Sequence, residues 1–157
     1  MNSTAPTNEQ SQVSLRPVNG ENWRAVTRLQ VTDAQREFVA EPCYYLALCS
    51  YGGDWHPLAI YRADEVIGFM MWAVDEKDGS CWLGGILVDA AVQGRGCGGQ
   101  AVREALSMLN RAHGYQHFAL SYQPANTAAR QLYQKLGFIE TAEWEDDEVV
   151  ARLSLPG

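Results

Sequence analysis

Two hydrophobic periods divide the first third of the chain into one strand and three short helices. Val13 to Arg16 alternates apolar and polar residues, which is the period of a strand with one buried face. The apolar positions that follow recur about every three residues, which is the period of a helix. Thr32 with Gln35 forms a capping-box pattern, and Pro42 suits a first helical turn. The expected helices cover residues 22–29, 32–38 and 43–50.

Three strands are expected next, and the last two are apolar on both faces. The apolar runs cover residues 57–61, 66–74 and 80–88, with polar turns at 63–65 and 75–79. Gly79 ends the second turn, which favours a hairpin. Strands that are apolar on both faces belong at the centre of a sheet that helices cover.

The second half of the chain alternates helices with strands. The expected strands cover residues 117–122, 138–143 and 149–155, and the expected helices cover 101–112 and 127–136. Gly114 and Gly137 follow the two helices as C-terminal caps, and Asn126 is a good N-cap. The acidic residues 145–148 form the turn of the terminal hairpin. The order β-ααα-βββ-α-β-α-ββ predicts an α/β fold with a mixed sheet.

Length, charge and hydropathy narrow the possible functions. The 157 residues predict a single domain over residues 13–157, after a disordered N-terminal tail of residues 1–12. A net charge of −7 argues against a nucleic-acid partner and suits a cationic substrate. No apolar run approaches the roughly 20 residues of a membrane span, and the N-terminus lacks a signal-peptide pattern. We therefore expect a cytoplasmic protein without membrane contact.

The cysteines and histidines do not form a pattern that predicts metal binding. The four cysteines show neither C-x-x-C spacing nor nearby histidines, so we expect reduced thiols and no metal site. The three histidines have no partners in the sequence that would predict a catalytic triad. The cysteines are Cys43, Cys49, Cys81 and Cys97.

A glycine-rich loop precedes the longest predicted helix. Four glycines fall within residues 94–99, and glycine accepts positive φ and lets a ligand approach the backbone closely. A helix that begins there directs unpaired N–H groups and its positive dipole end toward the loop. These features predict a site for a phosphate-bearing ligand.

The glycine spacing alone fits more than one ligand. Gly94-x-Gly96-x-x-Gly99 matches the dinucleotide fingerprint, but that fingerprint needs an acid about 20 residues later, and residues 121–124 contain none. No Gly-Lys-Ser/Thr follows, as a Walker A loop would require. A glycine-rich turn without a ligand is a further alternative.

Two motifs together resemble one family. Gln93-x-x-Gly96-x-Gly98 resembles motif A of the Gcn5-related N-acetyltransferases (GNAT), and residues 126–138 look like that family's N-x-x-A-x-x-L-Y-x-x-x-G-F. The motifs lie about thirty residues apart, with a helix and a strand between them, as in that family. The resemblance covers nearly the whole chain. It implies a GNAT-type fold with a mixed, mostly antiparallel central sheet flanked by helices.

The resemblance also implies chemistry and site residues. Acetyl-CoA is the expected cosubstrate, and its acetyl group is expected to pass directly to an amine. The N–H of Val88 is the expected donor to the thioester oxygen, and Tyr133 the expected acid for the thiolate. Asn126 is expected to bind pantetheine, to cap its helix, or to do both. The expected CoA-binding residues are Leu87, Val88, Asp89, Gln93, Gly94, Arg95, Gly96, Cys97, Gly98, Gly99 and Asn126.

A narrower resemblance concerns the acceptor. Residues 37–40, 55–61 and 66–70 look like bacterial diamine and spermidine acetyltransferases, which predicts a small polyamine such as spermidine. That subgroup often carries Arg or Asp where this chain has Gly84-Gly85. An aminoglycoside, an amino acid or a protein N-terminus therefore remains an alternative acceptor, and a non-catalytic acyl-CoA sensor is the alternative outside the enzymes.

The general base and the oligomeric state stay open at this point. Four carboxylates flank the expected acceptor cleft, and water is an alternative route for the amine proton. Proteins of this resemblance are often dimers, so the terminal hairpin is a candidate surface for a homodimer. The carboxylates are Glu37, Glu41, Asp75 and Glu76.

Overall fold

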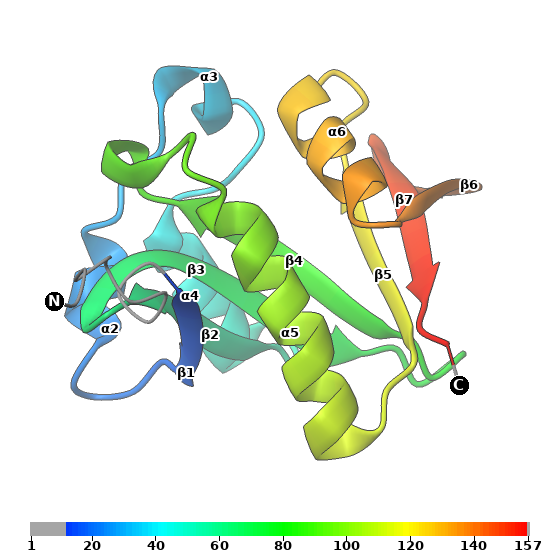
Figure 1. The fold of residues 1–157 in the computed structure, drawn as a ribbon, viewed down its shortest axis with the longest axis horizontal. Helices are drawn as coiled ribbons and strands as arrows, with labels where there is room; N and C mark the ends of the chain where they lie inside the picture. The colour runs from blue at the N-terminus through cyan, green and yellow to red at the C-terminus, as the bar shows by residue number, and fades with distance from the viewer. Residues whose placement is uncertain (1–11, 157) are drawn as a thin grey trace, which may run out of the picture.

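The computed structural model describes residues 12–156, which form a central sheet with helices on both faces (Figure 1). The tail expected over residues 1–12 lies outside the described residues, apart from Gln12. The strands are β1 (Val13–Pro17), β2 (His56–Arg62), β3 (Glu65–Val74), β4 (Cys81–Val88), β5 (His117–Tyr122), β6 (Ile139–Glu145) and β7 (Glu148–Ser154). The helices are α2 (Trp23–Thr27), α3 (Asp33–Arg36), α4 (Pro42–Tyr51), α5 (Cys97–His113) and α6 (Thr127–Lys135), and η1 (Ala90–Val92) is a 3₁₀ helix.

The seven strands follow the order β1-β2-β3-β4-β5-β7-β6. Among the strand pairs of residues 12–156, only β4–β5 is parallel, and the other neighbours are antiparallel. The predicted mixed, mostly antiparallel sheet is therefore confirmed, as is the predicted order of elements. The two strands that are apolar on both faces, β3 and β4, occupy the middle of the sheet, as expected of strands that helices cover.

Two apolar cores lie on opposite faces of the sheet. Residues of α5 and α6 pack with one core, which includes Leu109 and Tyr133. Residues of α2 and α4 pack with the other, which includes Val26 and Phe69. Figure 1 shows α5 crossing one face, while α2 and α4 lie on the other. The apolar stripe predicted for α5 is thus the surface that it buries.

The central strands β4 and β5 separate soon after they meet. They pair at two positions, Cys81 with Phe118 and Trp82 with Ala119. From there β4 continues beside β3, whereas β5 pairs with β7 along its whole length. The two strands diverge toward the start of α5 and toward α6 (Figure 1). Within the described part of the chain, this separation leaves the facing main-chain edge of β4 without a neighbouring strand.

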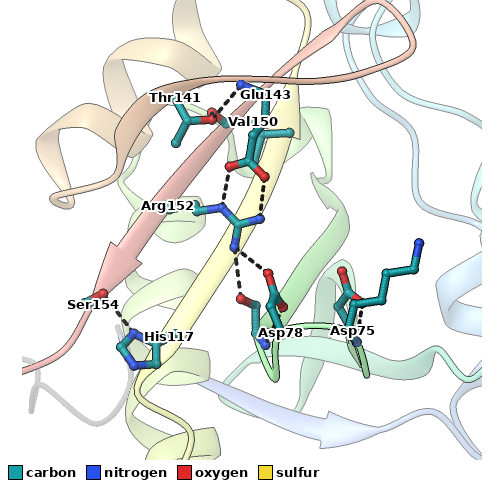
Figure 2. Close-up of polar contacts among 10 residues, drawn as sticks. Asp75, Asp78, His117, Thr141, Glu143, Val150, Arg152 and Ser154 are labelled. Carbon is teal, nitrogen blue, oxygen red and sulfur yellow. Dashed lines mark hydrogen bonds and ion pairs between the residues drawn. The ribbon is translucent and has the colours of Figure 1, made fainter.

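Arg152 of β7 joins two hairpins beside the point where β4 and β5 meet (Figure 2). Its Nε and Nη2 donate to the two carboxylate oxygens of Glu143 at 2.7 and 2.8 Å. Its Nη1 donates to Oδ2 of Asp78 at 3.3 Å and to Oγ of Ser80 at 2.9 Å. Arg152 also pairs in register with Ala119, one of the two β5 residues that contact β4. This network therefore ties the β3–β4 turn to the terminal hairpin at the closed end of the gap.

Two local expectations differ from the structure. Thr32 stands at the N-cap of α3 but forms no side-chain cap hydrogen bond, so the capping box is wrong. The acidic turn is shorter than residues 145–148, because β6 runs through Glu145 and β7 begins at Glu148. Asp146 makes this tight turn possible by adopting a φ of 52°. Glu148 consequently belongs to a strand rather than to a solvated loop.

Candidate active site

A cavity of about 1110 Å³ fills the gap between β4 and β5. One wall is β4 from Leu83 to Val88, and the opposite wall is the end of β5 with the first turns of α6. The glycine loop closes one part of the cavity, and α4 together with the β6–β7 turn borders another. Residues of both sequence motifs therefore line one cavity together with residues outside the motifs.

The glycine loop presents free backbone donors. Gly94 and Gly96 have φ values of 80° and 78°, and a Cβ on either would meet open space. Gly96 is the N-cap of α5, a helix of 17 residues. Gln100 N–H donates to the Gly96 carbonyl at 3.1 Å, whereas the N–H groups of residues 94–99 have no acceptor within residues 12–156. Free N–H groups at the positive end of a helix form an anion site, which fits a pyrophosphate.

The side chain of Gln93 braces this loop. Its Nε2 donates to the Val88 carbonyl at 2.9 Å and to Oε1 of Gln35 at 2.5 Å. The Gln93 side chain therefore links the glycine loop to the end of β4 and to α3, which contains Gln35. Any part that Gln93 takes in anion binding falls to its main chain.

Of three further predicted CoA-binding residues, Cys97 lines the cavity, whereas Arg95 and Asp89 do not. Cys97 is 4% exposed and packs in the core beneath α5. Arg95 is exposed and is not among the residues that line the cavity. Asp89 accepts from Ala91 N–H at 2.9 Å and from Gln30 N–H at 3.2 Å, and it also lies outside the cavity lining. The Asp89 carboxylate therefore serves as the N-cap of η1.

The main chain of β4 offers a donor toward the gap. Asp89 N–H donates to the Ile67 carbonyl at 2.7 Å, and Leu87 pairs in register with Phe69. Hydrogen bonds alternate along an antiparallel pair, so the intervening Val88 directs its N–H away from β3. Val88 and Leu87 both line the cavity, and the Leu87 side chain also belongs to the core that faces α4.

Tyr133 has a buried ring and a hydroxyl without a partner. The residue is 8% exposed, and its ring lies 5.7 Å from that of Tyr122 and 6.1 Å from that of Phe138. No group among the described residues donates to or accepts from this hydroxyl. Since every buried side-chain polar atom of these residues has a partner, the hydroxyl is not buried, and it opens into the cavity that Tyr133 lines. Burial raises the pKa of Tyr133 far above its usual value, with smaller contributions from Tyr122, Tyr45 and Glu148. The phenol is therefore protonated at neutral pH.

Asn126 caps α6 and also lines the cavity. Its Oδ1 accepts from Ala129 N–H at 3.2 Å, which confirms the predicted N-cap. The cap uses the oxygen of the amide and leaves its NH₂ group as a donor. The capping role and a ligand contact are therefore compatible.

A bulge in β4 lets aromatic rings approach the cavity. The β3–β4 register shifts where Gly84-Gly85 lies, and Gly85 has a φ of 58°. A Cβ on Gly84 would come within 3.3 Å of the Trp55 ring, and one on Gly85 within 3.2 Å of Tyr45 Cδ1. Larger residues here would displace these rings. The two glycines that depart from the polyamine subgroup thus create space for two aromatic side chains.

Glu148 is a cavity residue that the sequence reasoning did not single out. It is half-buried, and Ser121 Oγ donates to its Oε1 at 2.7 Å. Its charge contributes to the raised pKa of both Tyr133 and Tyr45. In the sequence, Glu148 cannot be distinguished from the other acidic residues of the turn. It differs from them in the structure because β7 begins at Glu148 and this residue is half-buried. Of the four carboxylates considered from the sequence, Asp75 lines the cavity, whereas Glu37, Glu41 and Glu76 do not.

Residues 12–156 show neither a metal site nor a membrane-spanning helix. These residues contain no group of three histidine, cysteine or acidic side chains that could hold a metal ion. None of their helices has the length and apolar character needed to cross a membrane.

Comparisons with known proteins agree with this geometry. The model of the acetyltransferase (GNAT) family matches residues 23–138. A spermine/spermidine N(1)-acetyltransferase of Bacillus subtilis is 24% identical over 141 residues, which is 80% of this chain and 87% of the relative.

Solved structures share the fold at lower identity. AAC(6′)-Ib in complex with ribostamycin and coenzyme A has a TM-score of 0.76 at 16% identity, over 92% of this chain and 94% of that one. RimL, a ribosomal L7/L12 α-N-protein acetyltransferase in complex with coenzyme A, has a TM-score of 0.70 at 15% identity, over 92% and 94%.

Proposed function

The chain belongs to the acetyltransferase (GNAT) family and is an N-acetyltransferase that uses acetyl-CoA, and we propose that its acceptor is a polyamine such as spermidine. The lining of the cavity carries this proposal. It combines aromatic faces with carboxylates, which suits an extended cation with apolar segments between its ammonium groups. The aromatic lining residues include Phe38, Tyr44, Tyr45, Trp55 and Trp82, and the acidic ones are Asp75, Glu145, Asp146, Asp147 and Glu148.

Acetyl-CoA fits the half of the cavity that the two motifs form. We assign its pyrophosphate to the free N–H groups of residues 94–99, with Arg95 at the exposed side of the loop. The pantetheine arm is peptide-like and takes the unpaired edge of β4 as an added strand would. Asn126 also lines the cavity, and its NH₂ group is the further donor that we assign to this arm.

The transfer itself needs two groups from this chain. The amine loses one proton to water, because only neutral nitrogen has a free lone pair. Nitrogen then bonds to the thioester carbon, and the Val88 N–H stabilises the negative charge that develops on the carbonyl oxygen. The carbon–sulfur bond breaks with its electron pair on sulfur, and Tyr133 protonates that sulfur. The second nitrogen proton restores the phenol, so the products are the N-acetylated amine and the CoA thiol.

A panel of amines tests the acceptor assignment. Release of the CoA thiol is followed with spermidine, spermine, a diamine, an aminoglycoside, an amino acid and a peptide with a free N-terminus. We expect kcat/KM to be highest for the polyamines, because their charges are separated by extended apolar segments that suit a wall of aromatic and acidic side chains. A higher kcat/KM for the aminoglycoside or the peptide would replace the polyamine assignment. Absence of amine-dependent thiol release would favour the acyl-CoA sensor.

A further inference from the structure

We propose that Tyr45 and Glu148 together form the binding site for the reacting ammonium group of the acceptor. Tyr45 supplies a ring face from α4, and Glu148 supplies a carboxylate from the start of β7. Both residues line the gap between β4 and β5 that also contains the Tyr133 hydroxyl. This inference rests on the proposed amine acetylation and assigns the residues that select and orient the amine.

The carboxylate of Glu148 is held in place before any ligand binds. Ser121 of β5 donates its hydroxyl proton to Oε1 at 2.7 Å, which leaves Oε2 free to accept from an ammonium group. Its neighbours in the acidic turn, from Glu145 to Asp147, are exposed, whereas Glu148 is half-buried. A charged hydrogen bond in this less polar setting is stronger than one at an exposed turn.

The ring of Tyr45 is fixed from three sides. Its hydroxyl accepts from Ala40 N–H at 2.9 Å, and its ring stacks on Phe69 with centroids 5.9 Å apart. Gly85 allows β4 to lie against it, because a Cβ there would come within 3.2 Å of Cδ1. A fixed aromatic face attracts a cation without an ordering cost at the moment of binding.

The position of these two residues matches the needs of the reaction. The carboxylate of Glu148 lies close enough to the phenols of Tyr45 and Tyr133 to affect the pKa of each. Tyr133 is more than nine-tenths buried, and its unpartnered hydroxyl opens into the same cavity. An ammonium group between Tyr45 and Glu148 would therefore share one cavity with the thioester sulfur that Tyr133 would contact.

Steady-state kinetics with spermidine and acetyl-CoA test this site. We expect Glu148→Gln to raise the KM for spermidine about tenfold or more, because it removes a charge-assisted hydrogen bond, while the KM for acetyl-CoA changes less than about twofold. Glu76→Gln is the matched control, since it removes the same charge from an exposed turn residue outside the cavity lining. We expect this control to leave both constants within about twofold of the native values.

A second pair of variants isolates the aromatic face. Tyr45→Phe and Tyr45→Leu both lose the hydroxyl that accepts from Ala40, but only Tyr45→Leu loses the ring. We expect the KM for spermidine to be at least about threefold higher in Tyr45→Leu than in Tyr45→Phe. Melting temperatures of all variants show whether each is folded.

Each outcome decides between the two proposals. If the native protein releases CoA with spermidine but Glu148→Gln behaves as Glu76→Gln does, the ammonium site is wrong and amine acetylation stands. Equal rises in the KM of both substrates would also overturn it, because they indicate general damage to the cavity. If the native protein acetylates no amine, the proposed function fails and this inference fails with it.

Discussion

At the scale of single residues, Tyr133 combines a buried ring with a hydroxyl that is open to the cavity. Its ring contributes to the core, but its hydroxyl forms no hydrogen bond within residues 12–156. No buried side-chain N or O atom of these residues lacks a partner, so this hydroxyl is open to the cavity rather than buried. The proposed protonation of the departing thiolate would use this hydroxyl, which the raised pKa keeps protonated at neutral pH.

Tyr133→Phe separates this chemical role from packing. We expect kcat to fall about hundredfold, since a positioned general acid contributes roughly that much or more. The melting temperature should stay the same or rise slightly, because the substitution removes no protein hydrogen bond. Thiol-release kinetics and a thermal melt are the two measurements. A variant with native kcat would exclude Tyr133 as the acid.

Some of the residues that line the cavity could be predicted from the sequence, and others could not. The two motifs identified Tyr133, Asn126 and the loop, because short-range spacing determines where such residues lie along one helix or turn. Glu148 and Ser121 were not predictable in this way, since their contact depends on the pairing of β5 with β7. The family resemblance also could not show that Gln93 and Asp89 use their side chains within the protein.

At the scale of elements, one carboxylate holds α6 against the sheet. Tyr122 of β5 donates its hydroxyl proton to Oε1 of Glu140 at 2.7 Å. Arg130 of α6 donates from Nη2 to Oε2 at 3.0 Å, and its Nε lies 2.7 Å from Oε1. These contacts link α6, which carries Tyr133, to β5 and β6. The hydrogen bond from Tyr122 and the charge and hydrogen bonds of Arg130 lower the pKa of Glu140 below its usual value.

This lowered pKa predicts a contribution to stability that depends on pH. A carboxylate whose pKa is lower in the folded state stabilises the fold above the unfolded-state pKa and loses that effect as pH falls through the folded-state pKa. We expect Glu140→Gln to lower the melting temperature at pH 7 by a few degrees, on the order of 1 kcal/mol, and to weaken the loss of stability from about pH 5 to pH 3. Thermal melts across this pH range, with Glu76→Gln as control, are the test. Parallel curves for Glu140→Gln and the native protein would contradict the link.

Element types were more predictable than element boundaries. Apolar periodicity and capping residues gave each helix and strand, because both are local properties of the chain. The ends of β6 and β7 were misplaced, since pairing across the hairpin extends both strands into residues that read as a polar turn. The separation of β4 from β5 has no local signal, because it depends on which strands pair.

At the scale of the whole molecule, the gap in the sheet divides the protein into two unequal parts. Strands β1 to β4 form one part, and β5 to β7 with α6 form the other. The cavity lies between them, and Arg152 joins them at its closed end. A ligand that contacts both parts therefore stabilises the folded state. Formation of a homodimer through the terminal hairpin stays a prediction.

Thermal shifts test which ligand occupies the loop. We expect saturating acetyl-CoA to raise the melting temperature by several degrees, since a ligand at about a hundredfold above its Kd adds about 2.7 kcal/mol. NAD at the same concentration should give no shift, because the acid that would bind its ribose is absent from residues 121–124. A shift with NAD and none with acetyl-CoA would restore the dinucleotide interpretation.

The central claim is that both substrates occupy the gap between β4 and β5 at the same time and that the acetyl group passes directly between them. Initial rates of thiol release, with acetyl-CoA and spermidine varied against each other, test this claim most directly. Direct transfer predicts reciprocal plots that intersect, together with no acetylated protein after incubation with acetyl-CoA alone. The buried position of Cys97 gives the same expectation, because a thiol that is 4% exposed is a poor acyl carrier. Parallel lines with an acetylated form of the protein would contradict the account.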